Sequence, residues 1–210
     1  MARPKTYDDR LRRALIDTAA ELIAAHGAEA LALRPLAERC DTSTNAIYTL
    51  FGSKAGLVGA VIAEAATSFT AAQLGITPTE DPLADLIGLG RAYRDWAIAH
   101  PALYAVMFGD RVPLPEVPSG PEEDSMAPLL TTVSRAMSAG QLRGADPMVV
   151  ATSIWAGIHG LVSLEIAGRL WAGEGVEALV EEHLVAIAAY WLADPSTTCG
   201  DAGSGVLNPT

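Results

Sequence analysis

Four uncharged hydrogen-bonding side chains share one face of a short predicted helix. Thr44, Asn45, Tyr48 and Thr49 fall opposite the apolar residues of segment 44–51. A solvated helix face normally carries Glu and Lys, whereas hydroxyl, amide and phenol groups suit base edges and phosphate oxygens. This face is therefore a candidate for nucleic-acid contact. A plain helical hairpin with a polar outer face is the alternative interpretation.

A lysine follows this helix at a position where helix stability does not favour a cation. Ser53 is a good N-cap residue for the next helix, so Lys54 stands in that helix's first turn. A positive charge there opposes the helix dipole. An anion held between Lys54 and the free backbone amides of the turn would explain the lysine, and a DNA phosphate is such an anion.

Two short helices joined by a tight turn must position these groups. Apolar residues at helical spacing predict the first helix over residues 33–40. Asp41 and Thr42 then break the pattern. Ser43 is expected to cap the second helix, which covers residues 44–51 and presents the polar face.

Residues 8–57 resemble the DNA-binding domain of the tetracycline-repressor (TetR) family. The segment STNAIYTLFGSKAGL, Ser43 to Leu57, is similar to that family's recognition helix and the start of its fourth helix. The resemblance implies that Tyr48 and Lys54 hold phosphates of double-stranded DNA while the other residues face its major groove or backbone. The candidate DNA-binding residues are Arg34, Ser43, Thr44, Asn45, Tyr48, Thr49 and Lys54.

Two positions depart from the family pattern. The family's turn often has Gly-Val where this chain has Asp41-Thr42, and its second helix often has a Ser or Thr cap where this chain has Ala32. Asp41 also places a negative charge near the DNA. These departures affect the expected DNA affinity more than the expected fold.

Charge is distributed unevenly along the 210 residues, which carry a net charge of −11. Residues 1–60 hold eight Lys/Arg and seven Asp/Glu, a net of +1, whereas residues 61–210 hold six and 18, a net of −12. The N-terminal quarter is thus a locally basic module on an acidic body. Its first residues include Arg3, Lys5, Arg10, Arg12 and Arg13, like an arm that could lie against phosphates.

Helical periodicity continues through the rest of the chain and predicts an all-α fold. Further helices are expected at about 8–26, 54–73, 82–99, 102–108, 126–139, 147–170 and 176–193. We predict an N-terminal three-helix helix-turn-helix bundle over residues 1–60. A larger helical ligand-binding and dimerisation domain follows over 61–193. Residues 194–210 have the composition of a disordered tail.

The last predicted helix needs two partners. From Leu184 to Leu192 it is apolar nearly all round, so its own domain can cover one side and a second subunit the other. We therefore predict a homodimer formed through the last two helices. Residues 147–164 lack charged side chains but include proline, glycines and hydroxyl residues, which favours a buried helix over a membrane span. No membrane partner is expected.

Aromatic residues and methionines gather on several of these helices. They can be packed core or the wall of an apolar pocket for a small hydrophobic effector. His159 can be a hydrogen-bonded core residue or a polar anchor for such a ligand. Residues 155–161 also resemble the Trp–His–Gly signature of one TetR-family branch. The candidate ligand-binding residues are Tyr93, Trp96, Tyr104, Met107, Phe108, Met126, Trp155 and His159.

Motifs of catalysis and metal binding do not occur in the sequence. Nucleophile elbows, P-loops, dinucleotide-binding glycines and metalloprotease motifs are absent, and the four histidines show no ligand spacing. We expect no enzyme activity, metal or cofactor. Two cysteines without disulfide or metal spacing, and a charged N-terminus without an apolar run, favour a cytoplasmic protein.

These patterns together predict a ligand-responsive transcriptional repressor that binds a palindromic operator as a homodimer. The alternative is a helical small-molecule-binding or adaptor protein that does not bind DNA.

Overall fold

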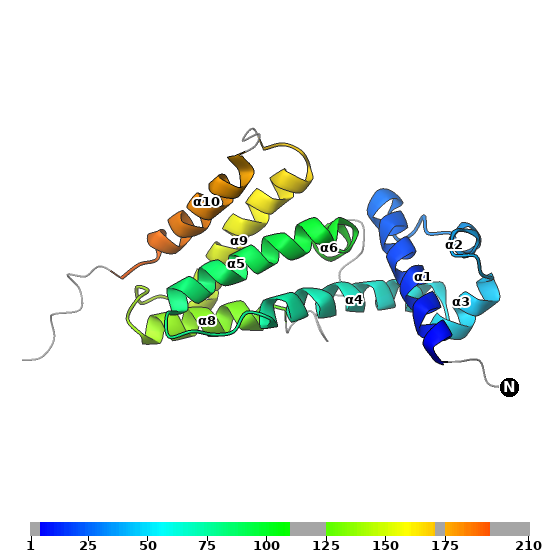
Figure 1. The fold of residues 1–210 in the computed structure, drawn as a ribbon, viewed down its shortest axis with the longest axis horizontal. Coiled ribbons are helices and arrows are strands. Elements are labelled where there is room, and N and C mark those ends of the chain that lie inside the picture. Colours follow the sequence, from blue (N-terminus) through cyan, green and yellow to red (C-terminus); the bar gives the residue numbers. More distant parts are fainter. Residues whose placement is uncertain (1–4, 110–124, 171–174, 194–210) are drawn as a thin grey trace, which may run out of the picture.

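Helices dominate the computed structural model, which describes residues 5–109, 125–170 and 175–193 (Figure 1). The N-terminal unit consists of α1 (Lys5–His26), α2 (Leu33–Arg39), α3 (Thr44–Phe51) and the first part of α4 (Lys54–Leu74). The body contains the rest of α4 together with α5 (Pro82–Ala99), α6 (Pro101–Phe108), α8 (Ala127–Ser138), α9 (Pro147–Ile166) and α10 (Val176–Tyr190). The all-α prediction is confirmed. The predicted disordered tail, 194–210, lies outside the described residues.

The ends of the short helices follow from local hydrogen bonds. Ser43 caps α3, because its hydroxyl oxygen accepts a hydrogen bond from the Ala46 amide at 3.2 Å. Ser53 caps α4 in the same way through the Gly56 amide at 2.9 Å. Ala32 precedes α2 and makes no side-chain cap bond. Ser43 and Ser53 therefore fix the residues at which α3 and α4 begin. The polar face lies on the segment between these two caps.

The turn between α2 and α3 contains a residue in the left-handed region. Asp41 has a φ of 48°, a conformation that glycine adopts without steric cost and that Asp tolerates better than most residues. This explains why an Asp can stand where the family pattern often has Gly. The Thr42 amide closes the turn by donating to the Ala37 carbonyl at 2.9 Å.

α4 connects the N-terminal unit to the body (Figure 1). Its buried residues recur every four positions, at Leu57, Val61, Ala65, Phe69 and Gln73. At its start α4 packs against α1 and α3, and further along it packs against α5, α6 and α8. α4 is therefore a direct structural connection between the body and the α3 face.

Three helix ends differ by three or more residues from their sequence-based predictions. α1 begins at Lys5, three residues before its predicted start. α9 ends at Ile166, because Gly168 enters the left-handed region with a φ of 63°. α10 ends at Tyr190, because the following residues pair with the α8–α9 connection. The Arg143 amide donates to the Trp191 carbonyl at 2.9 Å, and Leu142 bridges Leu192.

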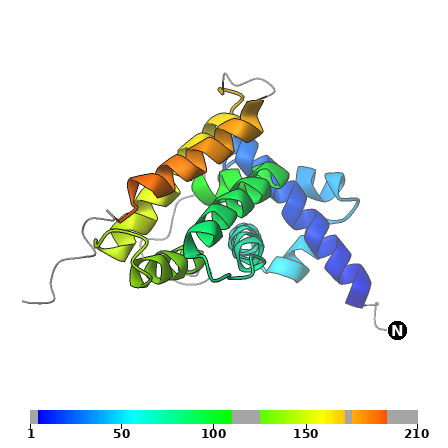
Figure 2. The ribbon, with the colours of Figure 1, turned by 60° about the vertical axis from the view of Figure 1, so that its left-hand side comes forward.

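α9 and α10 lie side by side against α5 (Figures 1 and 2). On α10, Leu184 packs inward and is 5% exposed, whereas Val185 and Tyr190 face outward. On α9, Met148 and Leu164 are exposed large apolar residues. The pair of helices thus has an outer face that the single chain leaves uncovered.

Two described helices, α4 and α9, are long and apolar enough to cross a membrane by length and composition alone. Core helices of soluble proteins meet the same test. In each helix 28% of the most apolar 18-residue window is buried within the single chain. A second protein subunit could cover the remaining apolar surface of α9 just as lipid could.

The contact between α5 and α10 depends on a glycine and gives a stability prediction. A Cβ atom on Gly90 would lie 2.3 Å from Leu184 Cδ2, whereas one on Gly59 of α4 would meet nothing within 4 Å. Gly59→Ala should therefore stabilise the fold by about 0.5–1 kcal/mol through helix propensity. Gly90→Ala has the same propensity gain but overpacks the core, and should cost about 1–3 kcal/mol. Urea unfolding of the two variants tests this. Equal stabilities would contradict the predicted close packing.

Candidate nucleic-acid interface and ligand pocket

The outer face of α3 is available to solvent. Ile47 is fully buried and fixes the inner side of the helix, while Tyr48 is 52% exposed. Asn45 and Thr49 are exposed beside it, and Thr44 is half-buried. The predicted polar groups therefore do lie together on one accessible surface.

Some of these groups already make hydrogen bonds within the chain. The Thr49 hydroxyl donates to the Asn45 carbonyl at 2.8 Å, so its oxygen remains available as an acceptor. Arg34 pairs with Glu38 at 3.2 Å on the exposed side of α2. Ser43 is engaged as the α3 cap. Thr49 and Arg34 keep hydrogen-bonding capacity for DNA, whereas the Ser43 hydroxyl oxygen would have to share its capping bond.

Lys54 has a partner that the sequence did not indicate. Its Nζ donates a hydrogen bond to the Glu29 carbonyl at 2.7 Å and so ties the start of α4 to the α1–α2 connection. An anion is therefore not the only explanation for a cation in this turn. An ammonium group carries three donors, so Lys54 can hold the carbonyl and a phosphate together.

Most of the basic residues at the start of the chain lie on a helix. Residues 5–13 belong to α1, and the Arg12 guanidinium carbon lies 4.8 Å from the centroid of the Phe51 ring. This cation–π contact helps to join α1 to the end of α3. Arg3 lies outside the described residues.

Within the body, several of the candidate ligand-binding residues form a closed cluster around His159. Tyr93 and Tyr104 place their hydroxyl groups 2.9 and 3.0 Å from His159 Nδ1. The Tyr104 hydroxyl also lies 2.7 Å from Ser163 Oγ. The Phe108 ring packs against both tyrosines and the histidine. These side chains come from α5, α6 and α9, so the cluster joins three helices.

The polar members of this cluster are held in their neutral forms. Burial raises the pKa of Tyr93 and of Tyr104 above the ordinary tyrosine value. Burial also lowers the pKa of His159 below its ordinary value. The cluster therefore offers a ligand hydrogen bonds but no charge.

The remaining candidates lie at the edges of this cluster. Trp155 packs against the His159 ring with centroids 5.3 Å apart. Trp96 turns toward α4, where its Nε1 donates to Ser68 Oγ at 3.1 Å and its ring packs on Phe69. Met107 is half-buried against the same core. The eight residues thus do not form one continuous wall.

A small cavity adjoins the cluster. Tyr93, Met126 and Trp155 border a space of about 30 Å³, which residues of α4, α8 and α10 also line. This is about the volume of one water molecule, whereas sites for drug-sized ligands measure roughly 300–1,000 Å³. An effector can enter this region only if side chains move apart.

Gln73 is a cavity residue that sequence reasoning missed. It is 5% exposed, borders the same cavity and donates from Nε2 to the Ser125 carbonyl at 3.1 Å. It continues the four-residue series of buried positions in α4, and that spacing was the available signal.

Asp85 and Arg135 were also missed, because 50 residues separate them. Arg135 Nη1 donates to the Asp85 carboxylate at 2.8 Å, and the Asp85 side chain is 4% exposed. The described residues contain no group of three or more His, Cys, Asp or Glu side chains that could hold a metal ion.

Comparisons with known proteins agree with this architecture. Residues 15–61 match the profile of bacterial regulatory proteins of the tetR family, and residues 86–187 match that of the tetracyclin repressor-like C-terminal domain. The chain belongs to the TetR family. It is accordingly a DNA-binding transcription regulator, and the family gives no indication of catalysis.

Individual relatives match this chain over most of its length. The chain is 25% identical to the HTH-type transcriptional regulator Rv1816 of Mycobacterium tuberculosis, over 77% of this chain and 79% of the relative. A protein of unknown function from Rhodococcus sp. RHA1 is 26% identical with a TM-score of 0.72, covering 86% of this chain and 95% of that one. A TetR family transcription regulator from Marinobacter aquaeolei VT8 is 19% identical with a TM-score of 0.75, covering 91% and 100%, which supports the fold.

Proposed function

We propose that the protein is a ligand-responsive transcriptional repressor that binds a palindromic operator as a homodimer in the cytoplasm. The observation that carries the proposal is the solvent-facing set of Asn45, Tyr48 and Thr49 on α3, next to Lys54. In this proposal Asn45, Thr44 and Thr49 read base edges, while Tyr48 and Lys54 hold phosphates. Arg34 and Ser43 add contacts at the rim.

The uncovered face of α9 and α10 supports the dimer. Val185 and Leu164 are exposed apolar residues on it. Ala156 and Gly160 are exposed small residues four positions apart on α9, and a Cβ on Gly160 would meet nothing within 4 Å. Small side chains allow a helix of a second copy to approach closely. Two copies related by a two-fold axis would present two α3 helices to half-sites about 34–36 Å apart.

The aromatic cluster supports an effector that is mostly apolar with few polar groups. In this proposal His159 and the two tyrosine hydroxyls supply hydrogen bonds, and the surrounding rings supply apolar contact. Opening the cluster would displace α6, which carries Tyr104 and Phe108 and packs against both α1 and α4. The signal then reaches the DNA-binding unit along two contacts.

The size of the response follows from linkage. A ligand acts only through its different affinities for the DNA-binding and non-binding shapes. A coupling free energy of about 1–3 kcal/mol would weaken operator binding roughly 5- to 150-fold.

Selection of genomic DNA fragments by the purified protein tests the proposed function. We expect recovery of fragments that share an inverted repeat. Their affinity should fall steeply as salt concentration rises, because phosphate contacts release counterions. An adaptor protein without DNA binding would retain no fragment above background at low salt, and that outcome would refute the proposal.

A further inference from the structure

A second hollow lies on the surface of the body, separated from the small cavity beside Tyr93 by the side chains of Gln73 and Leu89. It measures about 460 Å³ and is bounded by the end of α4, the connector 75–81 and the first turns of α8. Its wall is mainly apolar and includes Leu74, Ile76 and Leu89. We call this hollow the α4–α8 groove.

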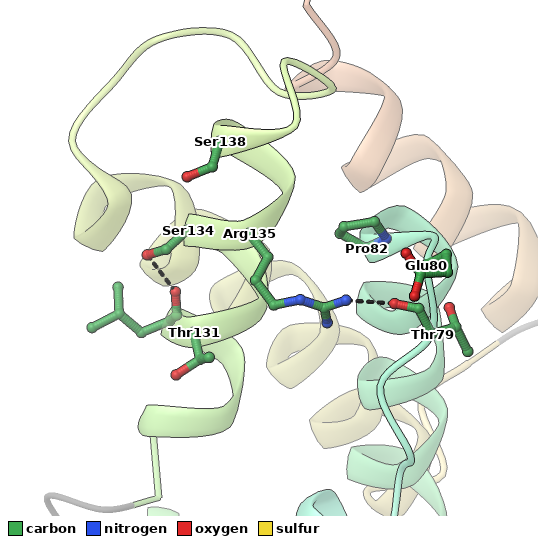
Figure 3. A pocket seen from close by; sticks show the side chains of 8 residues that line it. Thr79, Glu80, Pro82, Thr131, Ser134, Arg135 and Ser138 are labelled. Carbon is green, nitrogen blue, oxygen red and sulfur yellow. Dashed lines mark hydrogen bonds between the residues drawn. The ribbon is translucent and has the colours of Figure 1, made fainter.

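The groove continues into a more open hollow beside it. The two share Thr131 and Arg135, both on α8. Figure 3 shows this adjoining hollow, with Arg135 reaching from α8 across to Thr79 and with Glu80 beside that residue. The Arg135 side chain therefore borders both spaces.

The connector side of the groove is fixed by side-chain hydrogen bonds. Asp85 accepts from the Thr79 amide at 3.0 Å and from the Thr79 hydroxyl at 2.7 Å. Arg135 donates from Nη1 to Asp85 and from Nη2 to the Thr79 carbonyl. Because the amide and the carbonyl of Thr79 are both hydrogen-bonded, this part of the connector forms a preorganised wall. A preorganised wall lowers the entropic cost of binding.

Charges along the groove favour an uncharged ligand. Burial alone would raise the pKa of Asp85, but the hydrogen bonds from Arg135 and Thr79 outweigh it and hold that pKa below its ordinary value. The Asp85 carboxylate therefore stays ionised and cancels the charge of Arg135. Glu80 on the adjoining rim adds a negative charge, which disfavours an anionic ligand.

Arg135 has more hydrogen-bond donors than its bonds to Asp85 and Thr79 use. Arg135 has five N–H donors, and its bonds to Asp85 and Thr79 use two of them. A ligand with a hydrogen-bond acceptor can use the remaining Arg135 donors.

We propose that the α4–α8 groove binds a neutral, mostly apolar small molecule that carries a hydrogen-bond acceptor. Its volume falls within the range of roughly 300–1,000 Å³ that is usual for ligand sites. Gln73 and Leu89 border both this groove and the 30 Å³ cavity beside Tyr93. An occupant of the groove therefore touches the two side chains that separate it from the core.

Binding of a neutral fluorescent ketone tests the proposal. The probe is 6-propionyl-2-(dimethylamino)naphthalene, which is apolar and has a carbonyl acceptor. We expect saturable binding of one molecule per chain in the full-length protein without DNA, measured by fluorescence and by equilibrium dialysis. Because DNA is not needed, failure here would leave the proposed operator binding untouched.

Two matched substitutions locate the bound probe. Thr131 is exposed on α8 and lines the groove, so Thr131→Trp should fill the space and weaken binding by about tenfold or more, or 1.4 kcal/mol. Thr67 is exposed on α4 and does not line it, so Thr67→Trp should leave the affinity unchanged. Circular dichroism confirms that both variants fold.

A matched anionic probe tests whether the groove prefers an uncharged ligand. The matched anion 6-(dimethylamino)-2-naphthoate should bind about tenfold more weakly than the ketone, because of the charges of Asp85 and Glu80. The proposal is overturned by absence of saturable ketone binding, by unchanged affinity in Thr131→Trp, by equal losses in both tryptophan variants, or by tighter binding of the anion.

Discussion

Replacing Val185 by glutamate is expected to convert the proposed dimer into monomers and to abolish tight operator binding. Val185 is 53% exposed on α10, so the charge costs the single chain little. In a dimer it would be buried without a partner. Loss of the second half-site should weaken binding to a two-half-site operator by about 100- to 10,000-fold.

Light scattering at micromolar concentration and DNA-binding titrations measure these two effects. The matched control is Ile98→Glu, because Ile98 is a similar aliphatic residue that is 44% exposed on α5, a helix outside the proposed α9–α10 interface. This variant should remain dimeric and bind the operator normally. A wild-type protein that is monomeric under the same conditions would rule out the dimer proposal.

The choice of Val185 depends on the structure. Periodicity identified α10 as apolar on nearly every side, but it did not separate the inner residues from the outer ones. Leu184 is buried against Gly90, and Ile187 is half-buried next to Gly157, so both pack within the single chain. A charge at either position would disturb packing within the single chain, so its effect on dimerisation could not be separated from its effect on folding.

Local features of the fold were predictable from the sequence for a physical reason. The Ser43 and Ser53 caps and the α3 face depend on residues within one or two helical turns of each other. Their spacing is therefore visible in the sequence. The helix-turn-helix residues and the order of the helices followed from such local patterns.

Tertiary contacts were not predictable in this way. Tyr93 and Tyr104 lie 66 and 55 residues from His159, and no periodicity links them. The bond from Lys54 to the Glu29 carbonyl spans 25 residues and ends on a backbone atom, which carries no side-chain signature. The composition of the aromatic set was visible, whereas its closure into a packed cluster depends on how three helices meet.

The second large effect concerns the phosphate contacts. The double variant Tyr48→Ala/Lys54→Ala should bind every DNA sequence more weakly, by about tenfold or more for each lost contact to a charged group. Removal of the Lys54 charge from both subunits should also lower the slope of log affinity against log salt by about two. Asn45→Ala should instead change which base pairs are preferred, with a smaller effect on that slope.

Lys54→Ala also removes the hydrogen bond from Lys54 to the Glu29 carbonyl, so its effect on folding must be measured separately. For Tyr48, the milder variant Tyr48→Phe removes only a hydroxyl from an exposed ring, so it tests a phosphate contact without disturbing packing. Thermal unfolding of Lys54→Ala shows how much the lost carbonyl bond costs the N-terminal unit. If the double variant is fully folded and binds operator and random DNA as tightly as the wild type, Tyr48 and Lys54 do not contact phosphate. The α3 face would then dock on DNA in a different orientation, one in which neither side chain reaches the backbone.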